Sequence, residues 1–146
     1  MRHRAALAIL AGWMVLAAGC VVEQPAEEGT QAKEGPLTIA VCPKGTMHVF
    51  WKSIHAGAKQ AEQELEDVEI DWQGPVVEDD REAQVSLVET FLQKRVDGIV
   101  LAPLDSKALV PPVRRANAAG IPVVIIDSAL ADEDAYVSFV ATDNYK

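Results

Sequence analysis

The chain has 146 residues, of which 49% are hydrophobic and 24% are charged. This composition is typical of a single globular domain and excludes a disordered or fibrous chain. The formal net charge of −9 disfavours nucleic acid as a partner, because phosphate groups would be repelled.

Residues 1–19 are predicted to be a signal peptide for export. Arg2 and Arg4 precede an apolar stretch over residues 5–16, and small residues then lead to Cys20. The apolar stretch is shorter than the ~20 residues of a membrane-spanning helix, and a basic start with a small-residue end is typical of a cleaved signal. The ending "LAAGC" resembles a bacterial lipobox, which implies that Cys20 becomes the first mature residue and carries lipid. An ordinary secretory signal is the alternative.

Residues 20–36 are predicted to be a flexible tether, because Pro, Gly, Glu and Gln dominate this segment. Removal of the signal peptide would take away two arginines and no acid, which changes the net charge from −9 to −11. Only Cys42 would then remain as a free thiol, so we expect no disulfide framework in the domain over residues 37–146.

From residue 37 onward, apolar runs typical of buried strands alternate with helical spacing. The predicted strands cover residues 37–42, 68–72, 97–103, 121–127 and 136–142. This alternation predicts an α/β fold, a doubly wound parallel sheet with helices on both faces.

Three helices are predicted between the strands. The first carries an apolar stripe with steps of three and four that begins at Trp51. The second begins at a capping box made by Asp79 and Glu82. The third begins at the Pro111–Pro112 pair, since proline is tolerated only in the first turn, and ends at Gly120.

Signatures of metal and cofactor chemistry are absent from the sequence. There is no CxxC, HxxxH or HExxH motif, and His48 and His55 alone would leave a zinc ion without enough ligands. No GxSxG or GxGxxG motif follows a predicted strand. We therefore predict neither a metal nor a cofactor.

Polar and aromatic residues follow the carboxyl ends of the predicted strands, where open α/β sheets bind ligands. The candidate ligand-binding residues are Lys44, His48, Phe50, Trp51, Asp105, Asp127 and Ser128. Aromatic rings pack on the C–H faces of a sugar, and carboxylate and ammonium groups bond its hydroxyls. Three alternatives stay open: Trp51 as a core residue, Asp105 as a helix cap, and Lys44 as a solvated charge.

Four segments in register resemble the type I periplasmic binding proteins, in the ribose-binding-like branch of ABC importer receptors. They are "IAVCPKGTMHVFWKSIHAGAKQAEQEL", "VDGIVLAPLDSKAL", "AAGIPVVIIDS" and "VATDN". The resemblance implies a two-lobe fold that closes over a sugar. Residues 37–146 would then be most of the N-terminal lobe, and the chain would be truncated before the second lobe.

The resemblance also implies roles for single residues. Phe50 and Trp51 match the paired aromatics that stack on the sugar, and Asp127 matches a carboxylate that bonds its hydroxyls. His48 and Ser128 depart from the ribose pattern. A lysine at the position of Lys44, with an Asp-Ser pair at 127–128, is similar to the branch that binds rhamnose or furanose-like autoinducers.

We therefore expect a substrate-binding lipoprotein of an ABC-type sugar importer that binds a monosaccharide and is not an enzyme. It would lie in the cell envelope, on the periplasmic or extracytoplasmic side, held to the membrane by lipid. Its partners would be a small sugar and the permease subunits. The alternatives are an autoinducer or rhamnose-type receptor, the ligand core of a sugar-responsive transcriptional repressor, and an α/β enzyme whose chemistry lies in the missing half.

Overall fold

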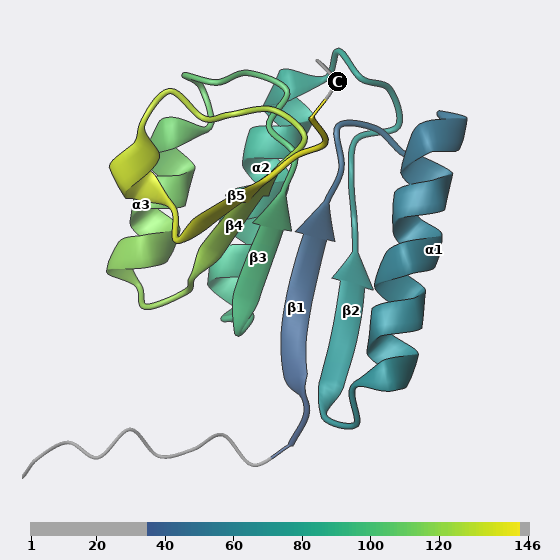
Figure 1. Ribbon diagram of the computed structural model, residues 1–146. Coiled ribbons are helices and arrows are strands. Elements are labelled where there is room, and N and C mark those ends of the chain that lie inside the picture. Colours follow the sequence, from purple (N-terminus) through teal and green to yellow (C-terminus); the bar gives the residue numbers. More distant parts are fainter. Residues whose placement is uncertain (1–34, 144–146) are drawn as a thin grey trace, which may run out of the picture. The chain divides into compact units, whose positions relative to one another are not determined.

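The computed structural model describes residues 35–143 (Figure 1). The predicted signal peptide, Cys20 and nearly all of the predicted tether lie outside these residues. The helices and strands are β1 (Leu37–Cys42), α1 (Val49–Glu64), β2 (Val68–Trp72), α2 (Arg81–Lys94), β3 (Gly98–Leu101), α3 (Val110–Ala118), β4 (Val123–Ile126), the 3-10 helix η1 (Glu133–Ala135) and β5 (Ser138–Val140).

The five strands form one parallel sheet in the order β2-β1-β3-β4-β5. The prediction of a parallel α/β sheet is confirmed. The chain moves outward from β1 to β2 and then crosses back to place β3 on the other side of β1. The strand order therefore reverses between β1 and β3, and the carboxyl edge at such a reversal is where this type of sheet binds ligands.

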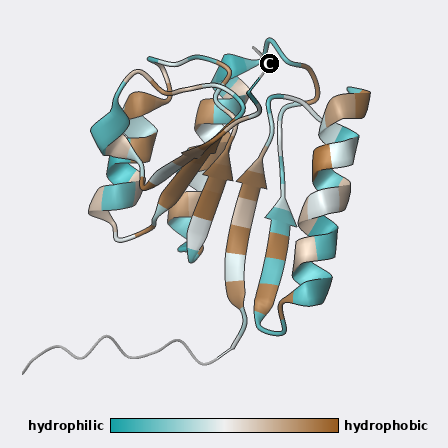
Figure 2. Ribbon diagram, viewed as in Figure 1, coloured by the Kyte–Doolittle hydropathy of each residue, from teal (hydrophilic) through white to brown (hydrophobic). Residues whose placement is uncertain are grey.

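Helix α1 packs on one face of the sheet, mainly against β2. Helices α2 and α3 pack on the opposite face (Figure 1). Alternate residues of a strand point to opposite faces, so Ala40 and Cys42 join the core beneath α2 and α3, whereas Val41 lies outside that cluster. The central strands are apolar along most of their length, and the outer helix surfaces are mostly hydrophilic (Figure 2). The largest side chains of this core are Phe91, Ile99, Leu101, Leu109 and Ile125.

The element boundaries differ from the predictions in ways that have local causes. Strands β1 and β2 have the predicted bounds, but β4 is shorter, because Pro122 has no N–H to donate and Asp127 adopts a left-handed backbone with φ 66°. The strands predicted at 97–103 and 136–142 are likewise shortened to Gly98–Leu101 and Ser138–Val140.

The predicted start of α2 is wrong by one residue. Asp80, and not Asp79, is the N-cap, and its Oδ1 accepts a hydrogen bond from the Ala83 N–H at 2.9 Å. The start of α3 agrees with the prediction, because the two prolines lie in its first turn. No helix between residues 35 and 143 is both long enough and apolar enough to cross a bilayer.

Candidate functional site

The loops that follow β1 and β3 are held together by the side chain of Gln84, which is fully buried on α2. Its Nε2 donates to the carbonyls of Pro43 at 3.1 Å and Ala102 at 2.8 Å. Its Oε1 accepts from the Leu104 N–H at 2.8 Å. One side chain therefore satisfies three backbone groups from two loops and fixes this part of the carboxyl edge.

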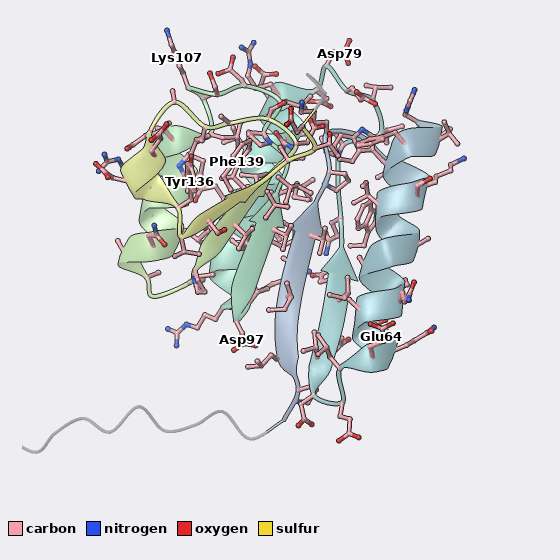
Figure 3. All side chains as sticks on the ribbon, in the orientation of Figure 1. Glu64, Asp79, Asp97, Lys107, Tyr136 and Phe139 are labelled. Carbon is pink, nitrogen blue, oxygen red and sulfur yellow. The ribbon has the colours of Figure 1, made fainter. Side chains whose placement is uncertain are left out.

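The loop between β2 and α2 packs against the loop between β1 and α1. The Thr46 hydroxyl donates to the carbonyl of Pro75 at 3.3 Å. A Cβ at Gly74 would lie 2.6 Å from Cγ of Pro43, so this close approach requires glycine. Figure 3 shows Asp79 in the first of these loops and Lys107 after β3, both at the carboxyl edge of the sheet.

A charged cluster joins the ends of β1 and β4. Lys44 Nζ lies 2.7 Å from Asp127 Oδ2 and donates to Ser128 Oγ at 2.5 Å. The Ser128 hydroxyl in turn donates to Asp127 Oδ2 at 3.1 Å. Asp127 adopts a left-handed backbone with φ 66°, a conformation that aspartate adopts more often than most residues other than glycine.

The aromatic residues at the start of α1 have different environments. The Nδ1 of His48 accepts from the Phe50 N–H at 3.2 Å, so this imidazole caps the helix. Phe50 is 44% exposed, and Trp51 is only 2% exposed. The two rings form an edge-to-face pair with centroids 4.8 Å apart, and Trp51 Nε1 donates to Glu78 Oε1 at 2.9 Å.

Phe50 therefore lies on the rim as predicted, whereas Trp51, for which the sequence also allowed a core position, is almost wholly buried. Trp51 begins the apolar stripe of α1, and this stripe turns its ring toward the sheet. It is nevertheless absent from the core cluster beneath α2 and α3.

Two cavities open at this edge, and both are lined by Phe50, Trp51 and Asp127. The first, of about 310 Å³, is the more polar and is completed by Lys44, His48 and Glu78. The second, of about 260 Å³, is mostly apolar and is completed by Ile54, Ile126, Val140, Ala141 and Thr142. An exposed aromatic ring thus lies next to a charged cluster, which suits a ligand with apolar faces and polar edges.

Asp105 is not brought to these cavities. Its Oδ1 accepts from the N–H groups of Ala108 at 2.7 Å and Lys107 at 2.9 Å, and its Oδ2 accepts from Arg81 Nη1 at 3.1 Å. These backbone donors, Ala108 first, hold the pKa of the Asp105 carboxyl below its usual value. Asp105 therefore caps the turn before α3, and the alternative that it caps the helix itself is wrong, because the N-cap of α3 is Leu109.

The remaining candidates for metal or nucleophile chemistry have other roles. The ring of His55 stacks on Trp72 at 4.4 Å, while His48 caps α1. Burial raises the pKa of the Cys42 thiol to about 12, so the reactive thiolate is disfavoured. Within residues 35–143, no three His, Cys, Asp or Glu side chains gather as metal ligands would.

Sequence reasoning missed Glu78 and Gln84. Glu78 stands in an acidic run, "VVEDD", that resembles an ordinary helix start, and nothing in the run indicates a contact with an indole 27 residues away. Gln84 is a polar residue within an amphipathic helix, and only the tertiary structure shows that its face is buried.

The chain thus forms an open parallel α/β sheet with a strand reversal, and aromatic and charged side chains lie at its carboxyl edge, where sheets of this class bind ligands. The chain belongs to the periplasmic binding protein family, because the family model described as "Periplasmic binding protein domain" matches residues 39–146.

Named relatives include the D-ribose/D-allose-binding protein of Pseudomonas aeruginosa, which is 39% identical over 114 residues that cover 74% of this chain and 36% of the relative. The ribose import binding protein of Bacillus subtilis is 31% identical over 147 residues that cover 98% of this chain and 46% of the relative. The chain therefore spans less than half the length of these relatives.

The fold also matches solved structures of sugar-bound proteins. An ABC transporter solute-binding protein from Agrobacterium vitis with bound D-fucose is 44% identical, with a TM-score of 0.70 over 73% of this chain and 38% of that chain. A carbohydrate transporter solute-binding protein from Agrobacterium radiobacter, in complex with D-arabinose, is 32% identical, with a TM-score of 0.71 over 77% of this chain and 37% of that chain.

Proposed function

We propose that residues 37–146 supply one lobe of the sugar receptor of an ABC importer, and that the two cavities are this lobe's part of the ligand site. The observation that carries the proposal is the half-exposed ring of Phe50 beside the Lys44–Asp127–Ser128 cluster. Support comes from relatives named for ribose, allose and apiose binding and from similar structures with bound sugars.

The chemistry of the site fits a neutral sugar. The face of Phe50 offers apolar area for the C–H side of a sugar ring, and Asp127 accepts hydrogen bonds from hydroxyl groups. An ammonium group has three N–H donors. Two of those on Lys44 are directed to Asp127 and Ser128, which leaves one for a ligand oxygen.

Family members are transport binding proteins, and we extend this to the chain as a receptor that binds without catalysis. A rhamnose-type or autoinducer ligand is the second candidate. The observation that favours it is the contact between Lys44 and the Asp127–Ser128 pair, the combination that the sequence resemblance attributes to that branch.

A thermal-shift screen of the full-length protein tests the proposal. The panel should contain neutral pentoses, hexoses, 6-deoxyhexoses such as rhamnose, and a furanose-type autoinducer, with nucleotides and amino acids as non-sugar controls. We expect the melting temperature to rise with one or a few sugars, because a ligand that binds only the native state stabilises it. A rise with the control compounds alone would contradict a sugar receptor.

We also propose that residues 1–19 are removed, that Cys20 carries lipid, and that residues 20–36 tether the lobe to the membrane. The support is the lipobox-like ending of the predicted signal. Two or more acyl chains would give stable anchoring, whereas one chain is marginal. Wild type should appear in the membrane fraction of cells and Cys20→Ala in the soluble fraction. Equal release of both proteins would refute the anchor.

A further inference from the structure

The carboxylate of Glu78, in the loop between β2 and α2, lies at the more polar of the two cavities. Its Oε1 accepts the hydrogen bond from Trp51 Nε1 at 2.9 Å, and its side chain lines the cavity of about 310 Å³. No other hydrogen bond or ion pair of Glu78 occurs among residues 35–143. One carboxylate oxygen is thus fixed by an indole, and the other has no protein partner in the part of the chain that the structure describes.

The neighbouring loop makes room for this arrangement. A Cβ at Gly45 would lie 2.8 Å from Cγ of Glu78 and 3.4 Å from its backbone nitrogen. Cβ atoms in proteins essentially never lie 2.8 Å from another carbon, so a side chain at position 45 would require Glu78 or the loop around position 45 to shift. The Thr46 hydrogen bond to the carbonyl of Pro75 holds the same two loops together. Glu78 is therefore held at the cavity by its own loop, by the loop between β1 and α1, and by Trp51 of α1.

We propose that Glu78 determines specificity in two ways. Its Oε1 positions Trp51, and its Oε2 accepts a hydrogen bond from a ligand hydroxyl in the more polar cavity. This inference rests on the proposed sugar-binding function and deepens it. The cavity then holds two carboxylates, Asp127 and Glu78, and one ammonium group that already pairs with Asp127. This balance favours neutral polyhydroxylated ligands over anionic ones such as uronates and sugar phosphates.

Four variants of the full-length protein separate these roles. Glu78→Gln keeps an acceptor for the indole but removes the charge, and Glu78→Ala removes both. Glu66→Gln is the matched control, because Glu66 is an exposed residue in the turn before β2. This turn lies at the amino ends of the strands, and the cavities lie at their carboxyl ends. The probe is the neutral monosaccharide that gives the largest thermal shift, titrated by calorimetry, and the Nε1–H resonance of Trp51 is followed by NMR.

We expect Glu78→Gln to bind the sugar about tenfold more weakly, since a charge-assisted hydrogen bond becomes a neutral one, with the Trp51 resonance nearly unchanged. Glu78→Ala should bind more weakly still and should shift that resonance. Glu66→Gln should match wild type. Gly45→Ala should resemble Glu78→Ala, because the added methyl group displaces the carboxylate.

Wild-type affinity in both Glu78 variants would overturn the ligand contact, and an unchanged Trp51 resonance in Glu78→Ala would overturn the positioning role. If the variants lose affinity only where the melting temperature of the unliganded protein also falls, the loss of affinity reflects a loss of stability, and Glu78 has only a structural role. If wild type binds no sugar in the panel, the proposed function fails and the ligand contact fails with it. The Trp51 resonance would still decide the positioning role.

Discussion

Phe50 and Trp51 are adjacent in the sequence, yet the start of α1 directs them to different environments. Successive helical residues are about 100° apart, so only one of two neighbours can face the sheet. Trp51 is buried and its indole bonds to Glu78, whereas the Phe50 ring is half exposed and lines both cavities. The exposed ring is therefore the one available to a ligand.

Phe50→Ala in the full-length protein should weaken sugar binding by ~1–3 kcal/mol, the range for one well-buried apolar side chain. The melting temperature of the unliganded protein should change little, because the ring is already partly exposed. Calorimetry and thermal unfolding measure the two quantities. Phe139→Ala is the matched control, since Phe139 on β5 is 43% exposed and does not line either cavity. A large fall in melting temperature with unchanged affinity would make Phe50 a packing residue.

Asp127→Asn should also weaken sugar binding, because a neutral amide replaces the charged acceptor for a ligand hydroxyl. Asparagine tolerates a left-handed backbone, so the φ of 66° should be retained. The side chains of the Lys44–Asp127 ion pair are 19% and 35% exposed, and an asparagine amide at position 127 can still accept a hydrogen bond from Lys44, so we expect only a small loss of stability. Calorimetry should therefore show a weaker affinity for the sugar, while urea unfolding should show a nearly unchanged free energy of unfolding. An unchanged affinity would exclude Asp127 as a ligand contact.

At the scale of elements, sequence patterns predicted what depends on local periodicity. The bounds of β1 follow from a continuous apolar run, those of β2 follow from an alternation of apolar and acidic residues, and the start of α3 follows from its two prolines. The cap of α2 was misplaced because Asp79 and Asp80 offer the same side chain one residue apart. The backbone conformation determines which of the two carboxylates accepts a hydrogen bond from a free N–H group at the helix start.

Gln84 shows what local patterns do not predict. Gln84→Leu should lower the free energy of unfolding by ~2–4 kcal/mol, because three backbone groups of Pro43, Ala102 and Leu104 would be buried without partners. Urea unfolding measures the difference. Gln93→Leu is the control, since Gln93 is exposed on the same helix and should be nearly neutral. Equal stability of the two variants would contradict the bridging role of Gln84.

At the scale of the molecule, the outer edge of the sheet is exposed and apolar. Val137, Phe139 and Val140 are exposed on or beside β5, which pairs only with β4 in the described part of the chain. Figure 3 shows Phe139 on this outer strand. An unpaired apolar edge strand favours association between chains.

A chain of residues 20–146, produced without the predicted signal peptide, should therefore self-associate more than a protein that also carries the second lobe implied by the resemblance. It should also bind no sugar with micromolar affinity, because the two cavities are open and would leave one side of the ligand in water. Light scattering and calorimetry test the two expectations. A monodisperse monomer that binds a monosaccharide at micromolar concentration would refute both.

The grouping of the candidate residues at one edge of the sheet was predictable from topology, but their contacts were not. The carboxyl edge and the strand reversal follow from the order of the elements, which places Lys44, Phe50 and Asp127 on one rim. The cluster that joins Lys44 to Ser128 spans 84 residues, and no local pattern encodes so distant a contact. The burial of Trp51 and the role of Glu78 likewise depend on how two loops pack.

The most direct test of the central claim is a crystal structure of the full-length protein grown with the sugar that gives the largest thermal shift. We expect the sugar ring to pack against Phe50, with hydroxyl groups within hydrogen-bond distance of Asp127 and Lys44. A sugar bound elsewhere, with the side chains of Phe50 and Asp127 remote from it, would show that this edge of the sheet is not the ligand site.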